Sequence, residues 1–318
     1  MSSLGRRFRR VAVPVLALTL TAGVAGPASA AGPRKVIVLP EARSAEGIAA
    51  GWRSTFYAGD MFNGDIFRGD TRRGTAGLFI DAPAGRMALG MTADLGNGLL
   101  FVAGGFTGHA YVYDIHDGST MAIYQFTEPN AGIINDVTLT NDGAWFTDSR
   151  QAKLYFIPIS DNGRLRPFRT LTLTGPAADT SGPFNNNGIS TTPDGTGLIV
   201  AHTARGVLNI VNPGTGTSET MKSVPVPNVD GLVRDGRTLW AVQFNRAGGE
   251  RPQAGQISRI RLSYQSSSAV LEKVILSDEF QVPTTAAKFG DRLGVVNAKF
   301  NTGFPPTAKE YEVVVVDS

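Results

Sequence analysis

The sequence predicts an all-β fold, a six-bladed β-propeller, on the strength of three observations. A unit of short hydrophobic strands separated by turns recurs six times, about every 45–50 residues. Glycine and proline are frequent, with 38 and 18 copies among 318 residues, which favours many turns over long helices. No long window beyond the first 30 residues shows the 3.6-residue spacing of an amphipathic helix. Units of this size, each forming a four-stranded blade, are typical of propellers.

Residues 1–30 have the features of a secretory signal peptide. Four arginines between positions 6 and 10 precede an apolar stretch over residues 11–24, and Pro27-Ala28-Ser29-Ala30 offers a cleavage site. A membrane anchor is the alternative, but the apolar stretch is shorter than the roughly 18 residues of a transmembrane helix and contains Pro14 and Gly23. We therefore expect a secreted or extracytoplasmic protein with no membrane partner after cleavage.

Composition excludes several classes of function. Without the four signal arginines the formal net charge of +3 becomes −1, so charge gives no reason to expect a nucleic-acid partner. The absence of cysteine excludes disulfides, thiolate zinc sites and Fe–S clusters, and only three histidines occur. Hydrophobic residues at 42% are enough for a core, and we expect residues 31–318 to form a single propeller domain.

The six units align along their whole length. Their opening residues, 43 to 54 positions apart, are Glu46, Leu89, Asn135, Asn187, Asp230 and Thr284. Second strands are predicted at residues 56–60, 100–104, 145–149, 198–202, 239–243 and 293–297. Asp-Gly pairs, which favour tight hairpin turns, precede three of these strands at residues 142–143, 194–195 and 235–236. Third strands follow at residues 65–68, 110–113, 153–157, 207–211 and 256–260.

The last unit lacks a fourth strand of its own. It ends with its third strand at residues 311–316, and no chain follows that could complete the blade. The hydrophobic segment at residues 35–39 precedes the first unit and can supply the missing strand. We therefore expect an N-terminal strand to close the ring by completing the last blade. A β-sandwich or stacked β domains are the alternatives.

The residues that open the units predict a metal site. The first strand of each blade lines the central channel of a propeller, so a residue just before it can point at the channel mouth. Four of the six positions carry oxygen donors, namely Glu46, Asn135, Asn187 and Asp230. Such a set suits one hard divalent cation, Ca²⁺ first, with Mg²⁺, Mn²⁺ or Zn²⁺ as alternatives. Asparagine and aspartate also form turns, which is the simpler explanation, although Glu46 is not a turn former.

The same residues carry a resemblance to a known family. The motifs Glu46-Gly47-Ile48, Asn135-Asp136-Val137, Asn187-Gly188-Ile189 and Asp230-Gly231-Leu232 resemble, in order, those of the SMP-30/gluconolactonase/LRE family. The resemblance implies a six-bladed propeller with one catalytic metal held by Glu46, Asn187 and Asp230. It also implies that Asn135 contacts the substrate and that Asp230 acts as the general base in lactone hydrolysis.

The sequence departs from the lactonases of that family in two places. Gly132-Ile133-Ile134 stands where they carry an arginine that holds a sugar, and the second unit offers Leu89 to the channel. Phe184, beside the asparagines at 185–187, can add an aromatic wall. These features favour an apolar or mixed small molecule over a sugar lactone.

Four more polar residues are expected near the channel mouth and are predicted to contact substrate. They end the second strand of their units: Asp60, His202, Gln243 and Asn297. No Gly-x-Ser-x-Gly motif occurs, so a metal-activated water is expected to attack the lactone or ester of a small-molecule substrate. The alternative is a non-catalytic propeller that binds a small ligand or a protein partner around a structural cation. The oligomeric state stays open.

Overall fold

The structure, a computed structural model of the chain, describes residues 36–222, 225–245 and 254–318. The predicted signal peptide at residues 1–30 lies outside these described residues. Within them, no helix has both the length and the hydrophobicity needed to cross a membrane.

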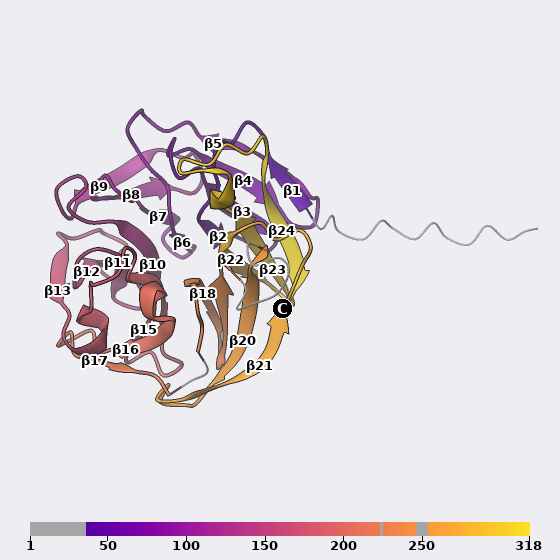
Figure 1. Cartoon of the computed structure of the whole chain (residues 1–318). Helices are drawn as coiled ribbons and strands as arrows, with labels where there is room; N and C mark the ends of the chain where they lie inside the picture. Colours follow the sequence, from indigo (N-terminus) through magenta and orange to yellow (C-terminus); the bar gives the residue numbers. More distant parts are fainter. Residues whose placement is uncertain (1–35, 223–224, 246–253) are drawn as a thin grey trace, which may run out of the picture. The chain divides into compact units, whose positions relative to one another are not determined.

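The described residues form six antiparallel four-stranded sheets arranged as a six-bladed propeller, which confirms the predicted fold class (Figure 1). Blade 1 consists of β2 (Ile48–Ala50), β3 (Thr55–Gly59), β4 (Ile66–Asp70) and β5 (Thr75–Ile80). Blade 2 consists of β6 (Met91–Asp94), β7 (Leu99–Ala103), β8 (His109–Asp114) and β9 (Thr120–Gln125). Blades 3 and 4 consist of β10 (Ile134–Thr140), β11 (Gly143–Asp148), β12 (Lys153–Pro158), β13 (Arg169–Thr172) and of β14 (Asn186–Thr191), β15 (Leu198–His202), β16 (Val207–Val211), β17 (Ser218–Thr220). Blade 5 consists of β18 (Val229–Asp235), β19 (Thr238–Gln243), β20 (Gln256–Leu262) and β21 (Ala269–Ile275).

The sixth blade closes the ring as predicted. Its strands are β22 (Pro283–Phe289), β23 (Arg292–Asn297), β24 (Tyr311–Asp317) and the N-terminal β1 (Val36–Leu39). β1 pairs antiparallel with β24, and Leu39 lies opposite Tyr311. In Figure 1 the indigo β1 accordingly lies beside the yellow β24. Among the described residues, the short 3₁₀ helices η1 (Gly175–Ala178), η2 (Thr203–Arg205) and η4 (Phe300–Thr302) lie in connecting loops.

The hydrophobic core lies between blades. Six clusters of buried apolar side chains can be traced, and each joins two neighbouring blades around the ring. Phe101 of β7, for example, shares a cluster with Phe146 of β11. Each sheet is therefore buried on both faces, which explains the nearly continuous hydrophobic runs of the second strands.

The first strands of the blades approach one another closely around the axis. A Cβ atom added at Gly47 would collide with the carbonyl oxygen of Leu89 in the next blade, and one at Gly188 with that of Asp230. Glycine therefore follows the opening residue in four of the six units because only hydrogen fits between the inner strands. This packing brings the opening residues of different blades together.

Candidate functional site

A cavity of about 450 Å³ lies at one mouth of the channel, where the opening residues of the blades meet. Six of the residues that the sequence singles out line it: Glu46, Leu89, Asn135, Phe184, Asn187 and Asp230. The other lining residues are Met61, Ile133, Thr203, Phe244, Asn245, Val282, Phe300, Asn301 and Phe304. No lysine, arginine or histidine belongs to this described lining, so no basic side chain there balances the carboxyl groups.

β-Bulges set the positions of the polar lining residues. The pairing of β14 with β15 runs from Asn186 opposite His202 directly to Ile189 opposite Val200, so Asn187 and Gly188 form an irregular step. The same shift occurs in β10 and β18 at the steps that contain Asn135 and Asp230. These residues therefore lie within first strands rather than in turns, and a bulge re-aims side chains out of the regular alternation of a strand.

The carboxyl groups at the channel mouth are buried, and no positive side chain of the described lining pairs with them. Glu46 and Asp230 are 4% and 7% exposed, and burial raises the pKa of both. The pKa of Glu46 is raised further by the charges of Asp230 and Asp136, and Asp230 reaches a pKa of about 8. A cation placed among these groups would remove the repulsion between them.

Two buried oxygens in the cavity have no hydrogen-bond partner among the described residues. They are Oε2 of Glu46 and Oδ1 of Asn187. The Asn187 amide is fixed because its Nδ2 donates to Oγ1 of Thr203 at 3.1 Å, and Thr203 in turn donates to the carbonyl oxygen of Val229 at 2.7 Å. A buried polar atom without a partner is costly, and a bound cation is one way to satisfy it.

The donor set fits an oxygen-preferring cation. Carboxylate and amide oxygens are the ligands of Ca²⁺ and related hard ions. Within the described part of the chain, no three His, Asp or Glu side chains gather in a way that could hold a metal ion, so the candidate set needs an amide. Glu46, Asn187 and Asp230 are the residues that could hold the ion, and Asn135, which is 5% exposed, lies at the same cavity.

The structure does not place four of the predicted substrate residues at the cavity. Asp60, His202, Gln243 and Asn297 are at most 1% exposed, and none of them lines it. They end second strands, where their side chains bond the loop that leads into the blade. Asp60 accepts from the backbone N–H of Arg43 at 2.8 Å.

The other three residues act in the same way. Gln243 donates to the carbonyl oxygen of Pro227 at 2.9 Å, and Asn297 donates to that of Glu279 at 2.7 Å. The Nε2 of His202 lies 2.9 Å from the carbonyl oxygen of Asp179. Because a carbonyl oxygen can only accept, Nε2 is the ring nitrogen that carries the hydrogen. These four residues therefore satisfy buried backbone groups of the loops that enter the blades, and their contact with substrate stays a prediction.

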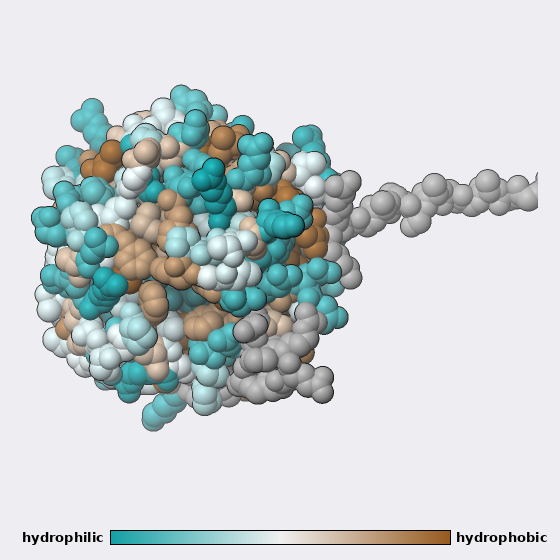
Figure 2. Space-filling view, turned by 45° about the horizontal axis from the view of Figure 1, so that its top comes forward, coloured by the Kyte–Doolittle hydropathy of each residue, from teal (hydrophilic) through white to brown (hydrophobic). Residues whose placement is uncertain are grey.

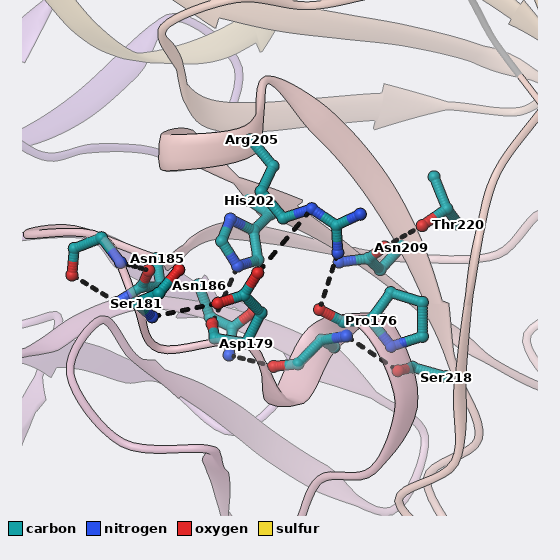
Figure 3. A network of polar contacts seen from close by, with 12 residues as sticks. Pro176, Asp179, Ser181, Asn185, Asn186, His202, Arg205, Asn209, Ser218 and Thr220 are labelled. Atoms are coloured by element: carbon teal, nitrogen blue, oxygen red, sulfur yellow. Dashed lines mark hydrogen bonds and ion pairs between the residues drawn. The ribbon is translucent and has the colours of Figure 1, made fainter.

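Figure 3 shows the polar contacts that hold the loop entering blade 4. Around His202, the side chain of Asn186 donates to the carbonyl oxygen of Ala177, and Ser218 accepts from the Ala177 N–H at 2.9 Å. Arg205 Nε lies 3.9 Å from a carboxylate oxygen of Asp179. The network holds the segment before β14, and with it the position of Asn187.

Sequence reasoning missed one carboxyl group and most of the apolar lining. Asp136 is 6% exposed, accepts from the backbone N–H groups of Val137 at 2.8 Å and Ile189 at 3.1 Å, and has a pKa raised by burial to about 7. It lines a second cavity of about 350 Å³ among the inner strands. One signal was available, because Asp136 replaces the glycine that four other units carry at this position.

The comparisons with known proteins concern the fold. No protein-family model matches the chain, and no curated protein matches it in sequence. Solved structures similar to it include regucalcin, a calcium-binding protein from Agrobacterium tumefaciens, with a TM-score of 0.59, 16% identity and coverage of 87% of this chain and 92% of that one. A luciferin-regenerating enzyme has a TM-score of 0.59, 14% identity and coverage of 91% and 93%.

A third neighbour is the PQQ-bound aldose sugar dehydrogenase from Streptomyces coelicolor, with a TM-score of 0.59, 15% identity and coverage of 90% and 97%. The three neighbours differ in activity, so at these identities the similarity identifies an architecture and no single function. This chain shares the propeller fold with regucalcin-like proteins and with other propeller enzymes.

Proposed function

We propose that this chain is a secreted, metal-dependent hydrolase that opens a lactone or ester of a small molecule by attack of an activated water. One observation carries the proposal: two buried carboxyl groups meet two amides at the channel mouth, and oxygens of Glu46 and Asn187 lack partners. The resemblance of these motifs to the SMP-30/gluconolactonase/LRE family supports it, as does the propeller fold shared with regucalcin.

Glu46, Asn187 and Asp230 would hold the cation in this proposal. All three supply oxygen, which favours Ca²⁺ and leaves Mg²⁺, Mn²⁺ or oxygen-bound Zn²⁺ as alternatives. When bound, such an ion polarises a carbonyl group and lowers the pKa of a water molecule. Thr203 keeps the Asn187 amide turned so that its oxygen stays free of protein partners.

The remaining steps belong to the chain's own side chains. Asp230 would accept the proton of the attacking water as its general base from within the same cavity. Asn135 would orient the substrate carbonyl from the same cavity. Leu89 and Phe184 would exclude further water, which strengthens electrostatic interactions at the reacting atoms.

Metal analysis combined with a substrate screen tests the proposal. Purified wild-type protein should hold about one divalent cation per chain, whereas Glu46→Ala and Asp230→Ala should hold much less. Replacement of Asp161, an exposed aspartate, should not change the metal content. A panel of lactones and esters should be hydrolysed by the wild type and not after chelation. Equal, low metal content in all four proteins would refute the metal site.

A non-catalytic role is the second candidate, in which the propeller binds a small ligand or a protein partner around a structural cation. The observation that favours it is Leu89, which is 1% exposed and takes the place that a polar residue has in the five other blades. Binding of a ligand with metal present but no turnover of any panel member would support this role over hydrolysis.

A further inference from the structure

The carboxyl and amide groups form the floor of the cavity, and the walls differ from this floor in chemistry. Above the carboxyl and amide groups the lining is largely apolar. One side is made by Met61, Leu89, Phe300 and Phe304, which come from blades 1, 2 and 6. Figure 2 shows hydrophobic residues, drawn in brown, gathered near the middle of the face turned toward the viewer.

Four phenylalanines from three loops pack together beside the cavity. The ring of Phe304 lies 5.2 Å from that of Phe62, 6.2 Å from that of Phe106 and 5.4 Å from that of Phe300, with tilted or edge-to-face geometry. We refer to these four residues as the aromatic wall. Phe304 still has 54% of its surface exposed, although it lies at a cavity and in contact with three other rings. A large apolar surface left free at a cavity is available for a ligand.

The loop between β23 and β24, which carries Phe300 and Phe304, is anchored at its base. Lys299 Nζ lies 2.6 Å from Glu312 Oε2, and both side chains are about nine-tenths buried. The other oxygen of Glu312 accepts from Asn297 at 2.7 Å, and Lys299 also donates to the carbonyl oxygen of Glu310 at 2.8 Å. A buried ion pair is costly unless further hydrogen bonds support it, and here each partner makes one more.

The middle of the same loop is braced by its own hydroxyl groups. Thr302 Oγ1 donates to the carbonyl oxygen of Lys299 at 2.8 Å and accepts from the N–H of Thr307 at 3.0 Å. Thr307 Oγ1 donates to the carbonyl oxygen of Thr302 at 2.8 Å. The aromatic wall is therefore held in place before any ligand arrives, which reduces the ordering cost of binding.

We propose that the cavity selects an uncharged carbonyl compound whose aromatic or alkyl group lies against the aromatic wall while its carbonyl group faces the candidate cation site of Glu46, Asn187 and Asp230. Each hydroxyl of a sugar lactone would lose water against this wall without gaining a partner. An anionic ligand would meet the buried carboxyl groups of the floor. A cavity of about 450 Å³ has room for one ring and a lactone. This inference deepens the proposed function and rests on it for the reacting group.

Binding and hydrolysis are measured separately to test the inference. For binding, the probes are the lactam 5-phenyl-2-pyrrolidinone and unsubstituted 2-pyrrolidinone, titrated calorimetrically in Ca²⁺. The phenyl lactam should bind at least about tenfold more tightly. Phe304→Ala should remove most of that difference, Phe304→Leu should restore part of it, and Tyr264→Ala, which removes a 68% exposed aromatic ring in blade 5, should leave it unchanged. For hydrolysis, the probes are γ-phenyl-γ-butyrolactone and glucono-δ-lactone.

The outcomes separate this inference from the proposed function. Faster hydrolysis of glucono-δ-lactone would overturn the inference and leave the hydrolase intact. Phenyl-lactam binding that depends on Phe304, without hydrolysis of either lactone, would support the ligand class and count against the hydrolase. Equal binding of the two lactams, or identical binding by wild type and Phe304→Ala, would overturn the inference. Phe304 is largely exposed, so its variants are expected to fold, and melting temperatures check this.

Discussion

Replacing Asp230 by asparagine should stabilise the metal-free protein at alkaline pH while weakening its affinity for a divalent cation. Burial first, and the charge of Asp136 second, raise the pKa of this carboxyl from 3.8 to about 8. Because the folded pKa lies above the unfolded value, the stability that Asp230 contributes is full below pH 4 and is lost as the pH rises through 8. Asparagine has a similar shape and carries no charge, so it avoids that loss.

The magnitude follows from the two pKa values. At about 1.4 kcal/mol for each pH unit between them, the ionised carboxylate costs the folded state roughly 6 kcal/mol at high pH. Water entering the cavity and proton uptake by the neighbouring carboxyl groups of Glu46 and Asp136 offset part of this cost. We therefore expect Asp230→Asn to gain about 2 kcal/mol at pH 9, which corresponds to roughly 4–8 °C in melting temperature for a domain of this size.

Thermal melts in chelator and in millimolar Ca²⁺, at pH 5 and pH 9, measure both effects. In chelator the variant should melt higher than the wild type at pH 9 and by a much smaller margin at pH 5. In Ca²⁺ the wild type should gain stability and the variant should gain less, since a ligand that binds more tightly stabilises the folded state more. Asp161→Asn, at an exposed position, is the matched control. A variant that melts lower than the wild type in chelator at pH 9 would refute the reasoning.

Three further predictions follow from the same contacts. Ca²⁺ affinity should rise between pH 6 and pH 9 and binding should release protons, because the cation needs the ionised forms of carboxyl groups whose pKa is raised. Calorimetry in buffers of different ionisation enthalpy measures the proton release, and a Ca²⁺ affinity that does not change with pH would contradict the prediction. Asn297→Ala should lower the free energy of unfolding by about 1–3 kcal/mol in denaturant melts and leave metal affinity unchanged, because its side chain makes three hydrogen bonds and all of them lie away from the cavity. Altered metal affinity at unchanged stability would contradict this prediction. Gly188→Ala should destabilise the fold by more than about 2 kcal/mol because its Cβ would collide with the carbonyl group of Asp230. Gly77→Ala, with open space around its Cβ, should be nearly neutral. Equal melting temperatures of the two variants would refute the packing argument.

The sequence predicts the ring and four of its polar cavity residues because both depend on repetition. Six copies of one hydrophobic pattern specify six blades, and a last unit without a fourth strand specifies closure by the segment before the first. Glu46, Asn135, Asn187 and Asp230 occupy one position of the repeat, so the symmetry of the fold brings them to one cavity. The placement of Asn135, Asn187 and Asp230 inside strands, through bulges, could not be read from residue types alone.

The polar residues at the ends of the second strands show the limit of inferring a site from repetition. Asp60, His202, Gln243 and Asn297 also occupy one repeat position, and the structure also gives them one task, which is to bond the loop entering the blade. A polar residue at a repeated position predicts a repeated contact, but sequence does not tell a ligand from a backbone carbonyl. The aromatic wall was missed for the opposite reason, because Phe300 and Phe304 lie in a loop that belongs to no repeat.

The backbone at the opening residues links the candidate metal site to the integrity of the ring. The carbonyl oxygen of Glu46 accepts from Thr284 at 2.8 Å across the junction where the sixth blade meets the first. The carbonyl oxygen of Asn135 accepts from the N–H of Gly90 at 2.9 Å, and that of Asn187 accepts from Thr147 at 2.7 Å, both from the preceding blade. Each of these three residues therefore points its side chain into the cavity while its backbone joins two blades. A cation bound by side chains from blades 1, 4 and 5 would oppose the opening of those junctions, so metal binding and closure of the ring would stabilise each other.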